Sequence, residues 1–300
     1  MPAVADSAAP ATLARRIGRY RVLREIGRGS TGVVHLAVDP SIPRHVALKT
    51  LALGAEFRGG DFAEARDRLR AEAEASRRLD HPDIAAVIDA GEHDGTVWLA
   101  MELLSGCELN RYTRPPRLLP ETVVLEIVER LARALAHAHE RGVVHRDIKP
   151  GNVVVDLPRG TVKLTDFGVA GLADLGRTRT GVVLGTPAYM APEQLAGGAA
   201  DGRGDLYSLG VLLFHLLAGR LPHEHGSLGE LLRRVAREPA PDLCTLRPEL
   251  PPALAAVAAR ALQPQPGGRF ATGTEMADAL AAARSACSPP AGHTPRIVAP

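Results

Sequence analysis

Four residues in the middle of the chain carry side chains that phosphoryl chemistry needs. In the segment from His145 to Asn152, Asp147 offers a carboxylate that can accept a proton, Lys149 a positive charge and Asn152 an amide oxygen. Asp166 follows Asn152 by 14 residues, after a strand-like run. Phosphoryl transfer spreads negative charge over oxygens, so positioned cations and a metal supply most of the catalysis. Because carboxylate and amide oxygens suit Mg²⁺, this set predicts a site for a phosphate group and a metal.

A glycine-rich segment near the N-terminus could hold phosphate groups. Gly27, Gly29 and Gly32 precede Val33 and Val34, and glycines let the backbone approach phosphate oxygens without a Cβ clash. The segment lies between two strand-like runs instead of opening a helix, which argues against a Rossmann dinucleotide site. Such turns also join strands that bind nothing, so this signal is weak by itself.

A lysine in an apolar strand gives the glycine segment more weight. Lys49 follows Ala47 and Leu48 about twenty residues on, and its charge could hold α- and β-phosphates if a carboxylate fixed it. The helical segment Asp61 to Leu79 offers Glu72 and Glu74. Glu72 shares one helical face with Leu69, Ser76 and Leu79, whereas Glu74 points nearly the opposite way. We therefore predict that Glu72 pairs with Lys49.

The elements around these residues change in kind along the chain. Tyr20 to Leu51 and Ile84 to Leu104 read as strands on either side of the helical segment 61–79, and the chain turns helical from Glu121. Further helices are predicted at 205–218, 252–262 and 274–284. This pattern predicts a disordered lead over residues 1–18, a folded domain over 19–284 with lobes at 19–102 and 108–284, and a Pro-rich tail over 285–300.

Five motifs in order resemble one family, the eukaryotic-like (Hanks-type) serine/threonine protein kinases of the bacterial type. They are the glycine segment, Ala47-Leu48-Lys49, His145 to Asn152, Asp166-Phe167-Gly168 and Ala191-Pro192-Glu193. The resemblance covers roughly Tyr20 to Arg284. It implies an α+β, two-lobed protein kinase fold, with a small β-rich first lobe and a larger helical second lobe, that transfers the γ-phosphate of ATP to protein hydroxyls.

The resemblance also assigns roles at the catalytic centre. It implies that Asp147 acts as the base, that Lys149 neutralises the moving phosphoryl group, and that Lys49 and Glu72 hold the ATP phosphates. Asn152 and Asp166 would bind Mg²⁺, with Mn²⁺ as an alternative. The lysine two residues after the base and Thr186 in Gly185-Thr186-Pro187 are typical of the serine/threonine branch.

The same resemblance implies an ATP pocket between the lobes. Val34 and Ala47 would cover the adenine, Val154 would lie beneath it, Met101 would limit the rear, and the backbones of Glu102 and Leu104 would bond it. The implied ATP-binding set is Ile26, Gly27, Arg28, Gly29, Ser30, Gly32, Val34, Ala47, Lys49, Met101, Glu102, Leu104 and Val154. Cys107 could lie at the mouth of this pocket or be a buried, inert thiol.

Regulatory and structural roles follow by the same resemblance. Thr178 and Thr180 are candidate autophosphorylation sites, and a phosphate there could pair with Arg146. The alternative is that both are plain loop threonines. Among structural residues, Glu193 would pair with Arg269, and Asp205 would anchor the backbone of the catalytic loop.

Composition adds limits. The 300 residues carry a net charge of +2, so neither nucleic acid nor a membrane surface is expected as a partner. The three cysteines form no CxxC pair, and residues 1–18 lack the apolar run of a signal peptide, which favours the cytoplasm. No apolar run is long enough to span a bilayer. The expected partners are ATP, protein substrates and a second copy that is phosphorylated in trans.

Three alternatives remain at this point. A pseudokinase would bind nucleotide without turnover, but Lys49, Asp147, Asn152 and Asp166 are all present. A small-molecule phosphotransferase is disfavoured by the long segment from Asp166 to Glu193, where protein substrates dock in the family. A scaffold role carried by the surface leaves no readable signature.

Overall fold

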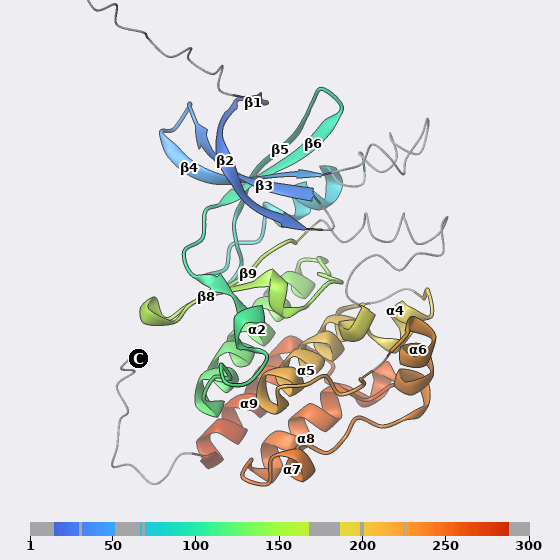
Figure 1. Cartoon of the computed structure of the whole chain (residues 1–300). Helices are drawn as coiled ribbons and strands as arrows, with labels where there is room; N and C mark the ends of the chain where they lie inside the picture. Colours follow the sequence, from blue (N-terminus) through green and yellow to red (C-terminus); the bar gives the residue numbers. More distant parts are fainter. Residues whose placement is uncertain are drawn as a thin grey trace, which may run out of the picture.

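The computed structural model describes residues 15–29, 32–51, 67, 70–167, 187–198, 201–224 and 226–287. A lobe built on a curled β-sheet lies above a larger, mainly helical lobe (Figure 1). The largest apolar core lies in the helical lobe, and two smaller clusters pack on the sheet. The predicted two-lobed α+β architecture is confirmed.

The first lobe is an antiparallel sheet with the strand order β1-β2-β3-β4-β6-β5. The strands are β1 Arg16–Ile17, β2 Tyr20–Gly29, β3 Gly32–Asp39, β4 Arg44–Leu51, β5 Val87–His93 and β6 Thr96–Glu102. Residues 70–76 form a helix in the same lobe. β4 is buried from Val46 to Leu51, because an apolar cluster packs on each of its faces. Lys49 lies in this strand and is only 4% exposed, so its ammonium group needs a partner.

The sheet begins earlier than the sequence predicts. Ile17 of β1 pairs with Tyr20 of β2, although both residues of β1 fall in the lead that was predicted to be disordered. Ile17 is 4% exposed and packs in the cluster that contains Tyr20 and Trp98, whose rings meet edge to face at 5.3 Å. This burial accounts for the order of a strand that is too short to leave a periodic signal.

Gly32 is required where β3 begins. Its φ is +146°, and a Cβ on it would lie 1.9 Å from the carbonyl oxygen of Thr50 on β4. By contrast, a Cβ on Gly29 would meet nothing. Gly32 is therefore required by the packing of β3 against β4, whereas the open space around Gly29 leaves its backbone accessible.

A small sheet connects the two lobes. Its strands lie in the order β7-β8-β9, with β7 at Cys107–Glu108, β8 at Val153–Asp156 and β9 at Thr161–Leu164. The amide of Leu164 donates to the carbonyl of Asp83 at 2.8 Å, and the amide of Ala85 donates to Leu164 at 2.9 Å. These bonds tie the first lobe to the strand that leads directly to Asp166.

The second lobe is organised around one buried helix. Its helices are η1 Leu109–Tyr112, α2 Glu121–Glu140, η2 Pro150–Asn152, η3 Leu157–Arg159, η4 Pro187–Tyr189, α4 Pro192–Leu195, α5 Gly202–Ala218, α6 Leu228–Arg237, α7 Leu243–Leu246, α8 Pro252–Ala261, η5 Pro266–Gly268 and α9 Gly273–Cys287. α5 is buried from Gly204 to Leu217, because α2, α7 and α8 pack around it. α9 lies against α2 and extends three residues beyond its predicted end at residue 284.

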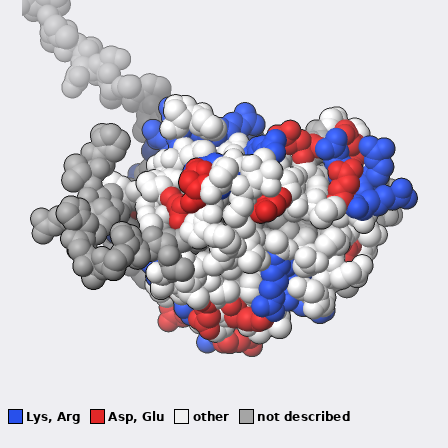
Figure 2. Space-filling view, turned by 90° about the horizontal axis from the view of Figure 1, so that it is seen from below, with Lys and Arg blue, Asp and Glu red and all other residues white. Residues whose placement is uncertain are grey.

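Charged side chains on the described surface form separate groups. Seen from below the helical lobe, basic and acidic side chains gather in small clusters with uncharged surface between them (Figure 2). Within the described part of the chain, no helix combines the length and apolarity needed to cross a membrane.

Candidate active site

The segment from His145 to Asn152, called the catalytic loop below, brings three predicted residues into one hydrogen-bonded group. Lys149 Nζ lies 2.6 Å from Asp147 Oδ2, and Asn152 Nδ2 donates to the same oxygen at 3.0 Å and to the Asp147 carbonyl at 2.7 Å. Asn152 is 4% exposed, whereas about a quarter of the Asp147 side chain is exposed, at 27%. The carboxylate is therefore held by two donors while remaining accessible.

The same bonds fit a metal ion beside the loop. Because Asn152 uses its amide nitrogen on Asp147, its Oδ1 is left as an acceptor. Asp166 has a carboxylate with one oxygen, Oδ1, engaged by Lys49. Hard oxygen ligands of this kind suit Mg²⁺. Among the described residues, no group of three or more His, Cys, Asp or Glu forms a rival metal site.

Asp205 anchors the loop from the start of α5. Its side chain is 1% exposed and accepts hydrogen bonds from the backbone amides of His145 at 2.8 Å and Arg146 at 2.7 Å. Arg146 has a φ of +64°, which costs energy for a residue with a side chain. The buried carboxylate holds this strained turn in place, in the position that the sequence analysis gave to Asp205.

His139 is a member of this anchor that the sequence analysis missed. Its Nε2 lies 2.8 Å from Asp205 Oδ2, whereas His137, two residues earlier, lies near His81 with ring centroids 5.2 Å apart and the rings tilted by 55°. Residues two apart on a helix point to different faces, so the two histidines meet different partners.

Lys49 has a different partner from the one predicted. Its ammonium group pairs with Asp166 at 2.8 Å, and Glu72 lies 3.4 Å from Arg146 NH1 instead. Asp166 itself has a φ of +66°. Helical spacing identified Glu72 as the glutamate that faces the site. It did not identify the cation that Glu72 meets, which is Arg146, because Lys49 pairs with the carboxylate of Asp166.

Three of the predicted adenine-pocket residues gather in one apolar cluster on the sheet of the first lobe. Val34 packs against Ala47 and Met101 in one cluster, and each of the latter two is 8% exposed. The Glu102 carboxylate binds Lys163 at 2.9 Å, and its amide donates to Ala86 at 2.9 Å. The carboxylate and the amide of Glu102 are thus both engaged within the protein.

The rim of the pocket is more open. Ile26 is 39% exposed, and Leu104 and Val154 are half-buried. Arg28 makes an exposed ion pair with Glu25 at 2.7 Å, so its guanidinium is engaged at the surface.

Cys107 lies just beyond the hinge in β7. Its thiol is half-buried and contacts the hydroxyl of Tyr112 at 3.6 Å. It pairs with Val155 in the small sheet, and its neighbour Glu108 pairs with Val154. The thiol is therefore part of the packing between β7 and η1.

Glu193 and Arg269 meet below the site. The two guanidinium nitrogens NH1 and NH2 each lie 2.7 Å from a carboxylate oxygen of Glu193, and the Arg269 side chain is fully buried. Arg269 also donates to the carbonyls of Gln263 and Pro264, at 2.8 and 2.7 Å. One arginine thus joins α4 to the chain between α8 and η5.

Several predicted residues lie outside the described part of the chain. These are Ser30, Gly168, Thr178, Thr180 and Thr186. Within the described residues, the hydroxyl of Tyr189, three positions after Thr186 in the sequence, lies 2.6 Å from His215 Nδ1 in the interior, a pair that the sequence analysis did not identify. Burial raises the pKa of Tyr189 and lowers the pKa of His215 to about 4.

Comparison with known proteins places the chain in one family. Residues 20–274 match the protein kinase domain family. The chain is 43% identical over 272 residues to the serine/threonine-protein kinase PknJ of Mycobacterium bovis, covering 88% of this chain and 45% of PknJ. It is 40% identical to PknA of Mycobacterium tuberculosis, covering 91% and 63%.

A solved structure agrees with these relatives. The PknI kinase domain of Mycobacterium tuberculosis superposes with a TM-score of 0.73 at 34% identity, covering 90% of this chain and 98% of that domain. The chain spans about half the length of the curated relatives it matches. This chain therefore belongs to the protein kinase domain family, among the bacterial Hanks-type serine/threonine kinases.

Proposed function

We propose that the chain transfers the γ-phosphate of ATP to serine or threonine hydroxyls of proteins. The observation that supports this most is the catalytic loop, where Lys149 and Asn152 hold the exposed carboxylate of Asp147. The buried anchor at Asp205 fixes that loop. Positioning of this kind is the main contribution a protein makes to phosphoryl transfer.

The mechanism assigns one task to each side chain. Asp147 orients the substrate hydroxyl and accepts its proton as the oxygen attacks the γ-phosphorus and the β–γ bridging bond breaks. Lys149, 2.6 Å from Asp147, offsets the charge of the moving phosphoryl group. Asn152 and Asp166 would hold Mg²⁺, with Mn²⁺ as an alternative, which supplies charge neutralisation on the phosphates. Thr186 is proposed to lie near the acceptor hydroxyl.

In the nucleotide-bound state, the first lobe is proposed to hold ATP. Lys49 would bind the α- and β-phosphates below the glycine segment, and the adenine would lie in the cluster of Val34, Ala47 and Met101. For Lys49 to do this, its ion pair with Asp166 must open. Pairing of Lys49 with Glu72 would then follow release of Glu72 from Arg146.

We propose that phosphorylation of Thr178 or Thr180 triggers that exchange. A phosphothreonine carries about two negative charges at neutral pH. Arg146 is engaged by Glu72 at 3.4 Å, so a phosphate would compete with this carboxylate for the guanidinium. We propose that a second copy of the chain adds the phosphate in trans. Two described cysteines are free thiols, which with the use of ATP favours the cytoplasm.

Phosphate transfer from labelled ATP tests the proposal. The purified chain is incubated with Mg²⁺-ATP and a generic protein substrate, alongside Asp147→Asn, which keeps the shape of the side chain and removes its basicity. Loss of the base is expected to lower the rate by about 10² to 10⁴. Label on serine or threonine that disappears in the variant supports the kinase. ATP binding without any label favours a pseudokinase.

A second experiment separates regulation from chemistry. Phosphopeptide mapping locates the label, and Thr178→Ala/Thr180→Ala is compared with the wild type. If the exchange of ion pairs is correct, the double alanine variant stays slow after ATP treatment while Glu72→Gln is slow with or without phosphate. Label elsewhere in the chain, with unchanged rates in the threonine variant, would contradict the trigger.

A further inference from the structure

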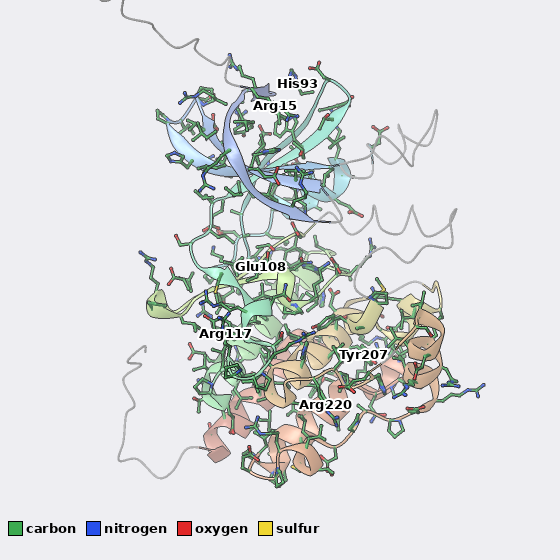
Figure 3. The ribbon with its side chains drawn as sticks, in the orientation of Figure 1. Arg15, His93, Glu108, Arg117, Tyr207 and Arg220 are labelled. Atoms are coloured by element: carbon green, nitrogen blue, oxygen red, sulfur yellow. The ribbon has the colours of Figure 1, made fainter. Side chains whose placement is uncertain are left out.

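A basic cavity lies beside the catalytic loop and has no role in the chemistry described above. Its volume is about 620 Å³, and seven residues between Asn110 and Arg117 line it, among them Arg111 and Arg114. We call it the arginine pocket. It is formed by the end of η1 and the loop that precedes α2, and Arg117 lies below Glu108 on the same side of the molecule (Figure 3).

The positive charge of the arginine pocket has no neutralising partner. Arg111, Arg114 and Arg117 are all exposed, and in the part of the chain that the structure describes none of their guanidinium groups makes a hydrogen bond or an ion pair. The nearest acid in sequence, Glu108, accepts a hydrogen bond from Asn110 instead. Three like charges around one cavity attract an anion.

One end of the pocket adjoins the catalytic loop. η1 packs against η2, and a Cβ on Gly151 would lie 3.0 Å from Asn110 Nδ2. Gly151 is two residues beyond Lys149, so Asn110 at the pocket wall lies close to the group that handles the phosphoryl. The pocket wall therefore packs against the end of the loop that carries Asp147.

The other end adjoins the segment that leads to Glu193. Arg114 interacts electrostatically with both Tyr189 and His215, and Pro115 lies 3.2 Å from where a Cβ on Gly219 would be. Burial holds the pKa of His215 at about 4, so the pair of Tyr189 and His215 is uncharged at neutral pH. This pair therefore does not neutralise the charge of Arg114. One end of the pocket thus meets the catalytic loop, and Pro115 at the other end packs against the residue that follows α5.

We propose that the arginine pocket is a substrate-specificity site that binds an anionic side chain of the protein substrate, a few residues from the hydroxyl that is phosphorylated. This rests on the proposed kinase activity. Guanidinium groups bind carboxylates and phosphates in the same bidentate geometry, so the ligand chemistry is an anionic side chain, either Asp or Glu or a residue that is already phosphorylated. Of the two, a carboxylate is the one we expect, because it needs no prior kinase.

Peptides that scan one charge along the sequence test the site. Each has a single threonine in an Ala/Gly background, with Glu, Gln, Lys or phosphoserine placed at one position at a time. Because an extended chain advances about 3.3 Å per residue, a fixed pocket selects one or two adjacent positions. We expect Glu there to raise kcat/KM about tenfold over Gln, the effect of one charge-assisted pair.

Variants separate the pocket from general attraction. Arg114→Gln should remove the preference for Glu, and Arg114→Glu should transfer it to the Lys peptide, a gain that a misfolded protein could not show. Arg44→Gln, an exposed arginine at the start of β4, is the matched control and should keep the preference. Equal preference in Arg114→Gln and wild type, or an equal loss in Arg44→Gln, would overturn the proposal. Stronger use of phosphoserine than of Glu would identify a phosphate as the preferred anion.

Binding of the same peptides to Asp147→Asn, followed by fluorescence anisotropy, does not depend on catalysis. Acid-dependent binding without transfer by the wild type would refute the kinase and leave the pocket standing. Transfer by the wild type with no positional preference, and no acid-dependent binding by the variant, would refute the pocket and leave the kinase standing.

Discussion

Removal of the Arg269 guanidinium should destabilise the second lobe strongly, although the residue is far from the chemistry. The side chain is fully buried, makes two 2.7 Å contacts with Glu193, donates to the carbonyls of Gln263 and Pro264, and stacks over Tyr207 at 4.9 Å. Arg269→Met keeps most of the stem and deletes the donors. It leaves a carboxylate without its cation and removes a donor from three carbonyl groups, those of Gln263, Pro264 and, at 3.2 Å, Arg203.

The size of the effect follows from these losses. Breaking a buried ion pair by removing one partner costs about 3–5 kcal/mol. Each carbonyl that loses its donor adds about 1 kcal/mol where water cannot reach it. Because Glu193 keeps 20% of its side chain exposed, water compensates part of the loss, and we expect about 4 kcal/mol in the free energy of unfolding. For a domain of this size that corresponds to a fall of about 10 °C in Tm.

The assay is urea and thermal unfolding of the single variants Arg269→Met and Glu193→Gln and of the double variant. Arg260→Met is the matched control, because Arg260 also contacts a glutamate, Glu275, at 2.6 Å, but both side chains are at least 40% exposed. An exposed pair contributes at most about 1 kcal/mol. The double variant should cost at least about 1 kcal/mol less than the sum of the singles, since the two residues interact. Equal costs for Arg269→Met and Arg260→Met, or strict additivity, would refute the reasoning.

Three further predictions concern single residues. Asp205→Asn should lower kcat and reduce stability by about 2 kcal/mol, because a neutral amide replaces a buried carboxylate that accepts two backbone amides; ATP-dependent transfer and urea unfolding measure both. Gly32→Ala should raise the KM for ATP and cost about 2 kcal/mol, because its Cβ would lie 1.9 Å from the Thr50 carbonyl; steady-state kinetics and Tm check this. Burial lowers the pKa of His215 from 6.5 to about 4, so between these pH values the residue is neutral when folded and protonated when unfolded. The free energy of unfolding should therefore be unaffected by this residue above pH 6.5 and should fall by about 3 kcal/mol between pH 6.5 and pH 4. His215→Gln, which keeps an acceptor for Tyr189, should show a smaller loss of stability over that window; an unchanged pH profile would rule this out.

Much of the fold was predictable because the signals are local. The catalytic loop places Asp147, Lys149 and Asn152 within six residues, so their juxtaposition depends on a single turn. α5 is apolar all round, which indicates a helix buried on every side, as it is in the structure. The order of the motifs along the chain then gave the two lobes.

What was missed depends on contacts between distant segments. β1 is a two-residue strand, ordered because Ile17 packs under Trp98, about eighty residues later in the sequence. Likewise, the pair formed by Tyr189 and His215 joins η4 to the far end of α5. Neither residue type at either position is unusual by itself, and periodicity reports which face a residue occupies but not what it meets there.

The partner of Lys49 shows this limit inside the site itself. The structure pairs Lys49 with Asp166 and Arg146 with Glu72, where the sequence predicted a pair between Lys49 and Glu72. Each arrangement pairs the same number of charges. The free-energy difference between the arrangements is therefore a small difference between large opposing terms, namely the desolvation of each ion, the geometry and the neighbouring charges. Lys49 is 5% exposed at its side chain while Arg146 is 36% exposed, so the less hydrated cation has the stronger need for the closer carboxylate, and Asp166 meets it at 2.8 Å. A few kcal/mol separate such arrangements, so a new anion that engages Arg146 would shift the pairing of Glu72, Lys49 and Asp166 as well. For the same reason, the sequence identifies which residues make up the site but not which of them pair.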